Sequence, residues 1–380
     1  MRPGVEVLLA DSSHLIAGRR VGLITNRSGV GRDGTSSIDL LYGGAELVAL
    51  FAPEHGIRGT EVGGAAIADA TDDATGLPIY SLYGETLAPT PEMLEGIDVL
   101  AFDLQDIGAR YYTYVSTMAH AMTAAGRAGV PFIVLDRPNP IGGLVQGPVL
   151  DTAFASFVGM YPVPVRHGLT SGELARLYQG EFGVEVQLHV VPVAGWSAER
   201  WFDDTELPWI APSPNMPSVE SAAHYPGTCL FEGTNISVGR GTDAAFQLLG
   251  APWLDGGAWA AGMLELADLP GVEVTPATFT PESPGDRKYA GETVSGIRLT
   301  VTDRARYDPV RTAVAALLVA RRLSGSAWAW REPHFDRLAG TDRLRLAIER
   351  DAAFADITSA WDGDVAAFEA LARPYLIYPR

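Results

Sequence analysis

The sequence predicts an α/β protein, with a Rossmann-like parallel sheet in an N-terminal domain and a smaller α+β C-terminal domain. In the first half, short apolar runs without polar alternation alternate with helical stretches, which is typical of a parallel sheet covered on both faces. Residues 207–217 then contain four prolines, so this stretch cannot form a regular element. We therefore expect a catalytic domain over residues 1–215 and a second domain over residues 216–380 that closes a cleft.

Local patterns place the individual elements along the chain. Runs rich in Val, Leu, Ile and Phe predict strands over residues 21–25, 47–51, 99–102, 132–135 and 186–193. Helix signals lie at residues 35–41, 91–94, 116–127 and 170–180, and the last of these opens with a T-x-x-E capping box. Residues 225–253 are rich in glycine and predict loops. The second domain is then expected to contain a strand over residues 296–301 and a core helix over residues 313–320.

Charge and hydropathy exclude several classes of partner. The chain has 46 acidic and 28 basic side chains, and the formal charge of −18 repels nucleic acid and anionic membranes. Its longest apolar helix candidate, residues 313–320, is far shorter than the roughly 20 residues that a membrane crossing needs. Residues 1–11 place Glu6 inside their only apolar stretch and lack the pattern of a secretion signal. We expect a soluble cytoplasmic protein whose partner is a small molecule.

The sequence also predicts that no metal and no cofactor is bound. Seven histidines are scattered without an HExxH pattern, and Cys229 has no second thiol to help it hold a metal. Residues 29–34 match G-x-G-x-x-G, a pattern found in dinucleotide-binding sites. Here, however, Thr35 and Ser36 resemble a helix cap after the last glycine, which would leave a pyrophosphate away from the helix N-terminus. A dinucleotide-dependent oxidoreductase is therefore the less favoured alternative.

Polar side chains follow four of the predicted strands. Because the carboxyl ends of parallel strands meet at one edge of a sheet, we expect these side chains to surround one site. Carboxylates can act as acid, base or nucleophile, and arginines can hold an anionic or hydroxyl-rich ligand. The residues singled out at these strand ends are Asn26, Glu54, His55, Arg58, Asp103, Asp106 and Arg110, with a further cluster at residues 136–140.

Other polar segments extend this candidate site. Tyr112 offers a flat amphipathic ring on which a sugar can stack. Long loops dense in glycine and polar side chains usually bind ligands or move, which brings in the second half of the chain. The additional candidates for ligand contact are Arg166, His167, Asn215, Glu232, Asn235 and Arg240. The absence of G-x-S-x-G removes the usual serine hydrolase on such a sheet. Glycosidase chemistry remains open, either with two carboxyl groups or with one carboxyl group assisted by the substrate.

Five ordered motifs give the chain a resemblance to a known family. They lie at residues 51–59 (FAPEHGIRG), 102–114 (FDLQDIGARYYTY), 136–140 (DRPNP), 214–217 (PNMP) and 231–235 (FEGTN). Together they resemble the exo-β-N-acetylmuramidase family typified by NamZ. The resemblance implies a glycoside hydrolase that removes N-acetylmuramic acid from the non-reducing ends of peptidoglycan-derived glycans or muropeptide fragments. It also implies that the glutamate of PEHG, here Glu54, is the leading catalytic candidate.

This resemblance suggests roles for the other candidates. Glu54 would protonate the glycosidic oxygen, and Asp103 or Asp106 would be the second carboxylate, with Glu232 as the other contender. The lactyl carboxylate of muramic acid would meet a guanidinium group, for which the candidates are Arg58, Arg110, Arg166 and Arg240. Two further alternatives are a protein that binds muropeptides without catalysis and a hydrolase of another acidic sugar.

Overall fold

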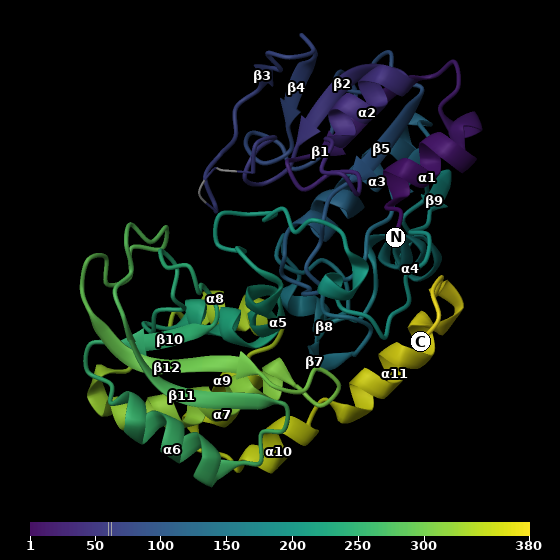
Figure 1. The fold of residues 1–380 in the computed structure, drawn as a ribbon. Helices are drawn as coiled ribbons and strands as arrows, with labels where there is room; N and C mark the ends of the chain where they lie inside the picture. Colours follow the sequence, from purple (N-terminus) through teal and green to yellow (C-terminus); the bar gives the residue numbers. More distant parts are fainter. Residues whose placement is uncertain (60, 62) are drawn as a thin grey trace.

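In a computed structural model, which describes residues 1–59, 61 and 63–380, the N-terminal half is built on a seven-stranded sheet (Figure 1). The strand order is β3-β4-β2-β1-β5-β6-β9, and every pairing is parallel except that of β3 with β4. The strands are β1 (Arg20–Thr25), β2 (Glu46–Ala52), β3 (Ala70–Thr71), β4 (Pro78–Ser81), β5 (Val99–Asp103), β6 (Phe132–Leu135) and β9 (Leu188–Val191). All five strands predicted from apolar runs are present.

Helices cover both faces of this sheet. Helices α1 (Gly4–Asp11) and α2 (Ser37–Gly44) contribute buried side chains to the core on one face. Helices α3 (Tyr114–Ala128) and α4 (Ser171–Glu181) pack on the other face. The predicted capping box of α4 is present, because Thr170 and Glu173 exchange side-chain to backbone hydrogen bonds. Both faces are apolar, which explains why the strands show no polar alternation.

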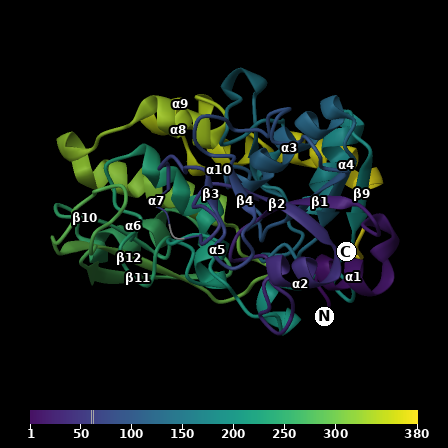
Figure 2. The same ribbon diagram turned by 90° about the horizontal axis from the view of Figure 1, so that it is seen from above.

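The C-terminal half contains a smaller antiparallel sheet in the order β10-β12-β11, seen beside the larger sheet in Figure 2. Its strands are β10 (Leu248–Ala251), β11 (Val272–Phe279) and β12 (Val294–Val301). The helices of this half are α5 (Val219–Thr228), α6 (Gly256–Leu266), α7 (Pro309–Ser324), α8 (Glu332–Ala339), α9 (Arg343–Glu349), α10 (Phe354–Ser359) and α11 (Asp362–Ala372). The helix predicted at residues 313–320 is the fully buried middle of α7.

The two halves share a continuous apolar core. Tyr111, which follows β5, packs against Tyr225 of α5 with ring centroids 5.4 Å apart. Helix α11 runs up beside the N-terminal half in Figure 1 and packs against β7 (Gln146–Val149). Strand β7 pairs with β8 (Pro164–Arg166). The Tyr378 hydroxyl donates a hydrogen bond to Asp136 at 2.6 Å. The last residues of the chain therefore stabilise the first sheet, although they follow the expected boundary at residues 215 and 216.

Two local predictions need correction. Residues 91–94 form consecutive turns rather than a helix. The connection to β5 is short, and Gly96, at φ 79°, ends this series of turns. The glycine-rich stretch predicted as loops begins inside α5, which continues through Pro226 to Thr228. By contrast, residues 207–217 contain neither helix nor strand, as expected. In the described part of the chain, every helix is too short or too polar to span a bilayer.

Candidate active site

Glu54 lies just after β2, in a tight turn at the carboxyl edge of the large sheet. His55 and Gly56 adopt positive φ angles of 73° and 71°, so the chain reverses directly after Glu54. The glutamate is only 8% exposed. Its Oε1 accepts a hydrogen bond from the Gly64 amide at 2.8 Å, and its Oε2 accepts one from the Thr113 hydroxyl at 2.6 Å. Each oxygen of this buried carboxyl group is therefore held by a donor from a different segment.

Two neighbours complete the surroundings of Glu54. Thr113 occupies the N-cap of α3, but its hydroxyl does not cap the helix and is free to bond to Glu54. Tyr83 follows β4, and burial together with the nearby charge of Glu54 raises the pKa of Tyr83 to about 12. At neutral pH the Tyr83 phenol is therefore protonated and can donate a hydrogen bond beside Glu54.

Asp106 provides a second buried carboxyl group after β5. Its Oδ2 accepts a hydrogen bond from the Gly108 amide at 2.7 Å and lies 3.5 Å from Nε2 of His167. Oδ1 is buried and makes no hydrogen bond within the described residues, and the same is true of the Tyr112 hydroxyl. Burial and the charges of Asp106 and Glu54 raise the pKa of Tyr112. Tyr112 therefore remains protonated at neutral pH.

Backbone and side-chain contacts join the ends of three strands around these groups. Asn26, after β1, donates from Nδ2 to the Tyr114 hydroxyl at 2.7 Å. Ser28 accepts a hydrogen bond from the backbone amide of Gln105, and the Gln105 side chain donates to the carbonyl of Pro138 at 2.9 Å. The polar segments after β1, β5 and β6 therefore converge at one edge of the sheet, and Asn26 acts there by holding Tyr114.

Asp103 has a different environment from Asp106. It is fully buried, and Arg137 donates to both of its oxygens, from Nε at 2.5 Å and from Nη2 at 2.9 Å. Arg137 also donates to the carbonyl of Val30 at 2.9 Å. Both oxygens of Asp103 are thus engaged in an ion pair that ties the end of β5 to the end of β6.

Arg110 and Arg166 are likewise engaged by the protein itself. Arg110 donates to the carbonyls of Pro148, Val163 and Leu338 at 2.7 to 2.9 Å. Arg166 donates to the Gln146 side chain at 2.7 Å and to the carbonyl of Ile141. Burial lowers the pKa of each guanidinium to about 10. These two arginines fasten the β7–β8 hairpin to its surroundings, and the structure does not present them to the region between Glu54 and Asp106.

Glu232 and Arg240 form an ion pair in the C-terminal half. Nε of Arg240 lies 2.6 Å from Oε1 of Glu232, and the Arg240 side chain is 18% exposed. The Arg240 guanidinium lies over Phe246, which packs against Tyr225 with ring centroids 4.6 Å apart. Tyr225 in turn meets Tyr112 edge-on at 5.8 Å. A continuous run of aromatic rings therefore connects this ion pair to the tyrosine beside Glu54.

Lys288, the only lysine in the chain, lies beside the same ion pair. It donates to the carbonyls of Phe231 and Ile236 at 3.1 and 2.8 Å, and burial lowers its pKa to about 8. Burial raises the pKa of Glu232, but Arg240 and Lys288 more than offset this and leave it below its ordinary value. Glu232 is therefore ionised at neutral pH.

The remaining candidates lie on loops. His55 places Nδ1 2.7 Å from the carbonyl of Glu61 and so helps to close the turn after Glu54. The side chain of Arg58 is 69% exposed and bonds to Asp72 at 3.3 Å. Arg58 thus points into solvent rather than into the buried part of the site.

Asn215 and Asn235 belong to the later motifs. Asn215 is half-buried within the proline-rich segment. Asn235 donates to the carbonyl of Ala327 at 2.8 Å and accepts from the amide of Ala329 at 3.1 Å, so both of its polar atoms hold the segment before α8. Across residues 1–59, 61 and 63–380, no three His, Cys, Asp or Glu side chains gather in a way that could hold a metal ion.

The glycine-rich turn after β1 has little room for a cofactor. The amide of Ser37 bonds to the carbonyl of Gly29 at 2.8 Å, and that of Gly31 bonds to the carbonyl of Thr35 at 2.8 Å, which closes the turn on itself. Ser36 caps α2 with its side chain, as the sequence indicated. Because the turn lies before the cap and is internally bonded, the structure disfavours the dinucleotide-binding alternative.

Comparisons with known proteins identify the family. The model of the N-terminal part of the exo-β-N-acetylmuramidase NamZ matches residues 21–220, and that of its C-terminal part matches residues 223–378. The chain belongs to the NamZ family. A relative from Bacillus subtilis (strain 168), the peptidoglycan β-N-acetylmuramidase NamZ, is 44% identical over 382 residues, which cover 100% of this chain and 91% of the relative.

Solved structures agree with this family assignment. A crystal structure of a DUF1343 family protein from Bacteroides fragilis has a TM-score of 0.91 and 37% identity, and the match covers 99% of this chain and 98% of that chain. A second DUF1343 family protein from the same organism has a TM-score of 0.80 and 30% identity over 100% of this chain and 99% of that chain. The predicted α/β fold class and the resemblance to the NamZ family, with its enzyme class, are both confirmed.

Some features of this NamZ family site were not foreseen from the residues. The bond from Thr113 to Glu54 has a partial signal, because Thr113 lies in the motif at residues 102–114, but nothing in that motif indicates which side chain it meets. The bond from the Gly64 amide has no sequence signal, because any residue could supply a backbone donor there. Lys288 stands out only as the single lysine.

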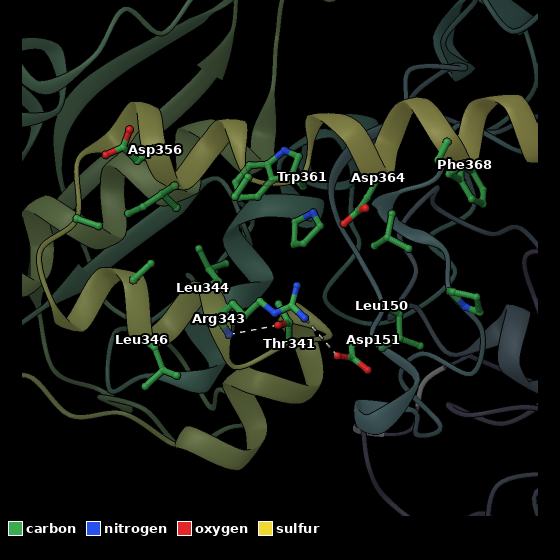
Figure 3. Close-up of a pocket in the computed structure, with 18 of the residues that line it drawn as sticks. Leu150, Asp151, Thr341, Arg343, Leu344, Leu346, Asp356, Trp361, Asp364 and Phe368 are labelled. Atoms are coloured by element: carbon green, nitrogen blue, oxygen red, sulfur yellow. Dashed lines mark hydrogen bonds and ion pairs between the residues drawn. The ribbon is translucent and has the colours of Figure 1, made fainter.

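A large apolar hollow of about 810 Å³ lies elsewhere, between the β7–β8 hairpin and helices α9 to α11 (Figure 3). Its walls include Leu150, Leu344, Trp361 and Phe368, and Arg343 lies toward Asp151 at its rim. None of the candidate residues predicted from the sequence lines this hollow. It is therefore separate from the site built around Glu54.

Proposed function

We propose that this protein is an exo-acting glycoside hydrolase that releases N-acetylmuramic acid from the non-reducing ends of peptidoglycan-derived glycans or muropeptide fragments. Membership of the NamZ family and the 44% identity to the Bacillus subtilis peptidoglycan β-N-acetylmuramidase support this function. The observation that carries the proposal is the buried Glu54 carboxyl group, held by Thr113 and Gly64 close to Tyr112. A second buried carboxyl group, Asp106, follows β5 at the same edge of the sheet.

Glu54 acts as the general acid in this proposal. A sugar oxygen leaves poorly as an alkoxide, so a proton from the Glu54 carboxyl group reaches the glycosidic oxygen as its bond to the anomeric carbon breaks. One water molecule is consumed overall, with its oxygen ending on the anomeric carbon and a proton restoring Glu54. The donors from Thr113 and Gly64 keep the carboxyl group in one orientation throughout, and this preorganisation favours the proton transfer.

Asp106 is the second carboxylate of the proposed site. Its negative charge stabilises the positive charge that develops on the sugar ring in an oxocarbenium-like transition state. Asp103 is less suited to this role because Arg137 already neutralises it and occupies both of its oxygens. Glu232 is ionised but is paired with Arg240, so its proposed part is to orient that guanidinium group.

Arg240 is the proposed partner of the lactyl carboxylate, the group that distinguishes muramic acid from N-acetylglucosamine. It is partly exposed and is connected through Phe246 and Tyr225 to the ring of Tyr112. Arg110 and Arg166 already donate to groups of the protein, and Arg58 points into solvent.

We also propose that the enzyme works in the cytoplasm on imported or recycled fragments.

The function is tested by following the products from two matched glycans. One carries N-acetylmuramic acid at its non-reducing end, and the other carries N-acetylglucosamine there. The proposal predicts release of free N-acetylmuramic acid from the first glycan only, one residue per chain end. Thermal stabilisation by the first glycan without any released sugar would instead indicate a binding protein, and release from a different acidic sugar would indicate another hydrolase.

A further inference from the structure

His167 and Asp106 form a buried pair, and the role of Asp106 as the second carboxylate does not explain the presence of His167 beside it. Both residues are almost inaccessible to solvent. Nε2 of His167 faces Oδ2 of Asp106 at 3.5 Å and makes no hydrogen bond to any described residue. The pair joins the segment after β5 to the segment after β8, where Arg166 is fixed by its bonds to Gln146 and Ile141.

A backbone contact decides which nitrogen of His167 carries the proton. The amide of Leu169 donates to Nδ1 of His167 at 3.1 Å, so Nδ1 must present a lone pair. The proton of the neutral imidazole is then on Nε2, which faces Oδ2 of Asp106. His167 is therefore set as a donor toward that oxygen, while the Gly108 amide supplies a second donor at 2.7 Å.

The other oxygen of Asp106 remains unengaged by the protein. Oδ1 is buried and makes no hydrogen bond to any described residue. Asp106 forms no ion pair with arginine or lysine within that part of the chain either. A buried carboxylate oxygen that lacks a donor is costly, so such an atom in a folded protein needs an explanation, and a catalytic or ligand-binding role is one. The Tyr112 hydroxyl, which is close to Asp106, is also buried and unengaged.

The sign of the charge limits what can bind at Oδ1. The lactyl carboxylate of a muramyl residue would be repelled by Asp106, and no cation is paired with Asp106 to offset this repulsion. A group with an N–H or O–H can bind there, and the acetamido N–H and the free hydroxyls of the sugar have this character. Arg240, by contrast, is suited to the lactyl group.

We propose that His167 is a positioning residue that holds Oδ2 of Asp106, so that Oδ1 accepts a hydrogen bond from a neutral N–H or O–H donor of the bound sugar. This inference rests on the proposed function and deepens it. It orients the substrate, with a neutral donor toward Asp106 in the N-terminal half and the lactyl carboxylate toward Arg240 in the C-terminal half. The acetamido group is next to the anomeric carbon, where Glu54 acts, and a ring hydroxyl is the other source of the donor.

The test uses three chromogenic β-glycosides of muramic acid: the complete N-acetylmuramide, an analogue without the acetamido group and an analogue without the 4-hydroxyl, which is the free ring hydroxyl. Values of kcat and KM are measured for the wild type, Asp106→Asn, His167→Ala and His167→Gln. Asp364→Asn, an exposed position on α11, is the matched carboxylate control. A lost hydrogen bond to a charged group predicts that Asp106→Asn lowers kcat/KM about 10- to 100-fold on the complete substrate.

The decisive result is selectivity between the substrates. We expect Asp106→Asn to lower kcat/KM less on the one analogue that lacks the donor than on the other two substrates, because only the lost charge still matters there. This difference identifies the donor as acetamido or hydroxyl. His167→Ala should show the same selectivity, and His167→Gln should recover part of the loss through its side-chain amide. The double variant Asp106→Asn/His167→Ala should match Asp106→Asn alone. An equal loss on all three substrates, or no rescue by glutamine, would overturn the inference.

A failure of the proposed function would look different. In that case the wild type would not cleave the complete glycoside, and the inference would be tested by measuring ligand binding instead of turnover. Calorimetric titration with N-acetylmuramic acid and the two matching analogues then measures Kd for the same variants. Selective weakening by Asp106→Asn supports the inference without catalysis, and uniform weakening or none contradicts it.

Discussion

The hydroxyl of Thr113 donates a hydrogen bond to Oε2 of Glu54 at 2.6 Å, which joins the turn after β2 to the first residue before α3. Thr113 and Glu54 belong to two different sequence motifs, at residues 102–114 and 51–59. The orientation of the Glu54 carboxyl group therefore depends on Thr113, the residue that precedes α3. This contact explains in physical terms why the two motifs occur in one protein.

Replacing Thr113 by valine removes this donor while keeping the shape of the side chain. Because a hydrogen bond to a carboxyl group is worth roughly 1.5–3 kcal/mol, we expect kcat/KM on a muramic acid glycoside to fall about 10- to 100-fold. The control is Thr123→Val, which removes a hydroxyl from the same helix where it bonds only to the carbonyl of Ala119. Steady-state kinetics of both variants check the prediction, and equal kinetics for the two would show that the Thr113 hydroxyl does not support Glu54.

The ion pair between Asp103 and Arg137 should act on stability. Arg137→Ala leaves a buried carboxylate uncompensated, so the free energy of unfolding should fall by about 3–5 kcal/mol. Chemical denaturation followed by tryptophan fluorescence measures this change. The exposed Arg322, which pairs with Asp351, is the comparison, and Arg322→Ala should cost less than about 1 kcal/mol. Similar losses in the two variants would argue against a structural role for the buried pair.

Apolar runs were sufficient to predict five of the seven strands of the large sheet, whereas β3 and β4 were not predicted. All five apolar runs in the first half became strands, since a run that is buried on both faces leaves a clear pattern in the sequence. The turns at residues 91–96 and the entry into α5 were not predicted correctly, because short elements depend on tertiary contacts that local signals do not encode.

The candidate site could be predicted only in part. The polar residues after β1, β2, β5 and β6 do meet at one edge, as the geometry of a parallel sheet requires. Their individual environments could not be deduced. Asp103 and Asp106 are three residues apart in one motif, yet one is neutralised by Arg137 and the other keeps an unengaged oxygen. Similarly, Arg110 and Arg166 resemble ligand-binding arginines in sequence but bind carbonyl groups of the protein.

Asp136 should make stability depend on pH in an unusual direction. Burial raises the pKa of its carboxyl group to about 6, although Tyr378, Thr170 and the Gly172 amide donate to it. Between about pH 4, the unfolded value, and about pH 6, the folded protein holds a proton that the unfolded chain has lost. The contribution of Asp136 to the free energy of unfolding is therefore largest below pH 4 and falls as the pH rises through 6, by up to about 3 kcal/mol.

This dependence is measured as a difference between two proteins. The free energy of unfolding is determined from pH 4 to pH 7 for the wild type and for Asp136→Asn, and the variant is subtracted from the wild type so that other carboxyl groups cancel. The difference should decrease as the pH rises through 6. Parallel curves for the two proteins would show that Asp136 does not titrate in this range.

Arg240 should determine the preference for muramic acid. Replacing it by glutamine removes the cation proposed to hold the lactyl carboxylate, so kcat/KM should fall at least about tenfold on an N-acetylmuramic acid glycoside. Hydrolysis of an N-acetylglucosamine glycoside, which is expected to stay at background, should not change, because that sugar lacks the carboxylate. Competition between the two glycosides measures this ratio directly. An unchanged ratio in Arg240→Gln would assign the carboxylate to another residue.

The catalytic part of Glu54 is tested most directly by Glu54→Gln, which keeps the size of the side chain and can still accept a hydrogen bond from one of its two donors, Gly64 or Thr113. The measurement is turnover of an N-acetylmuramic acid glycoside with a poor leaving group, together with the Kd for the same compound by calorimetry. We predict a loss of turnover of at least about a hundredfold with Kd changed by no more than a few-fold. Turnover within a few-fold of the wild type would contradict the role of Glu54 as the acid.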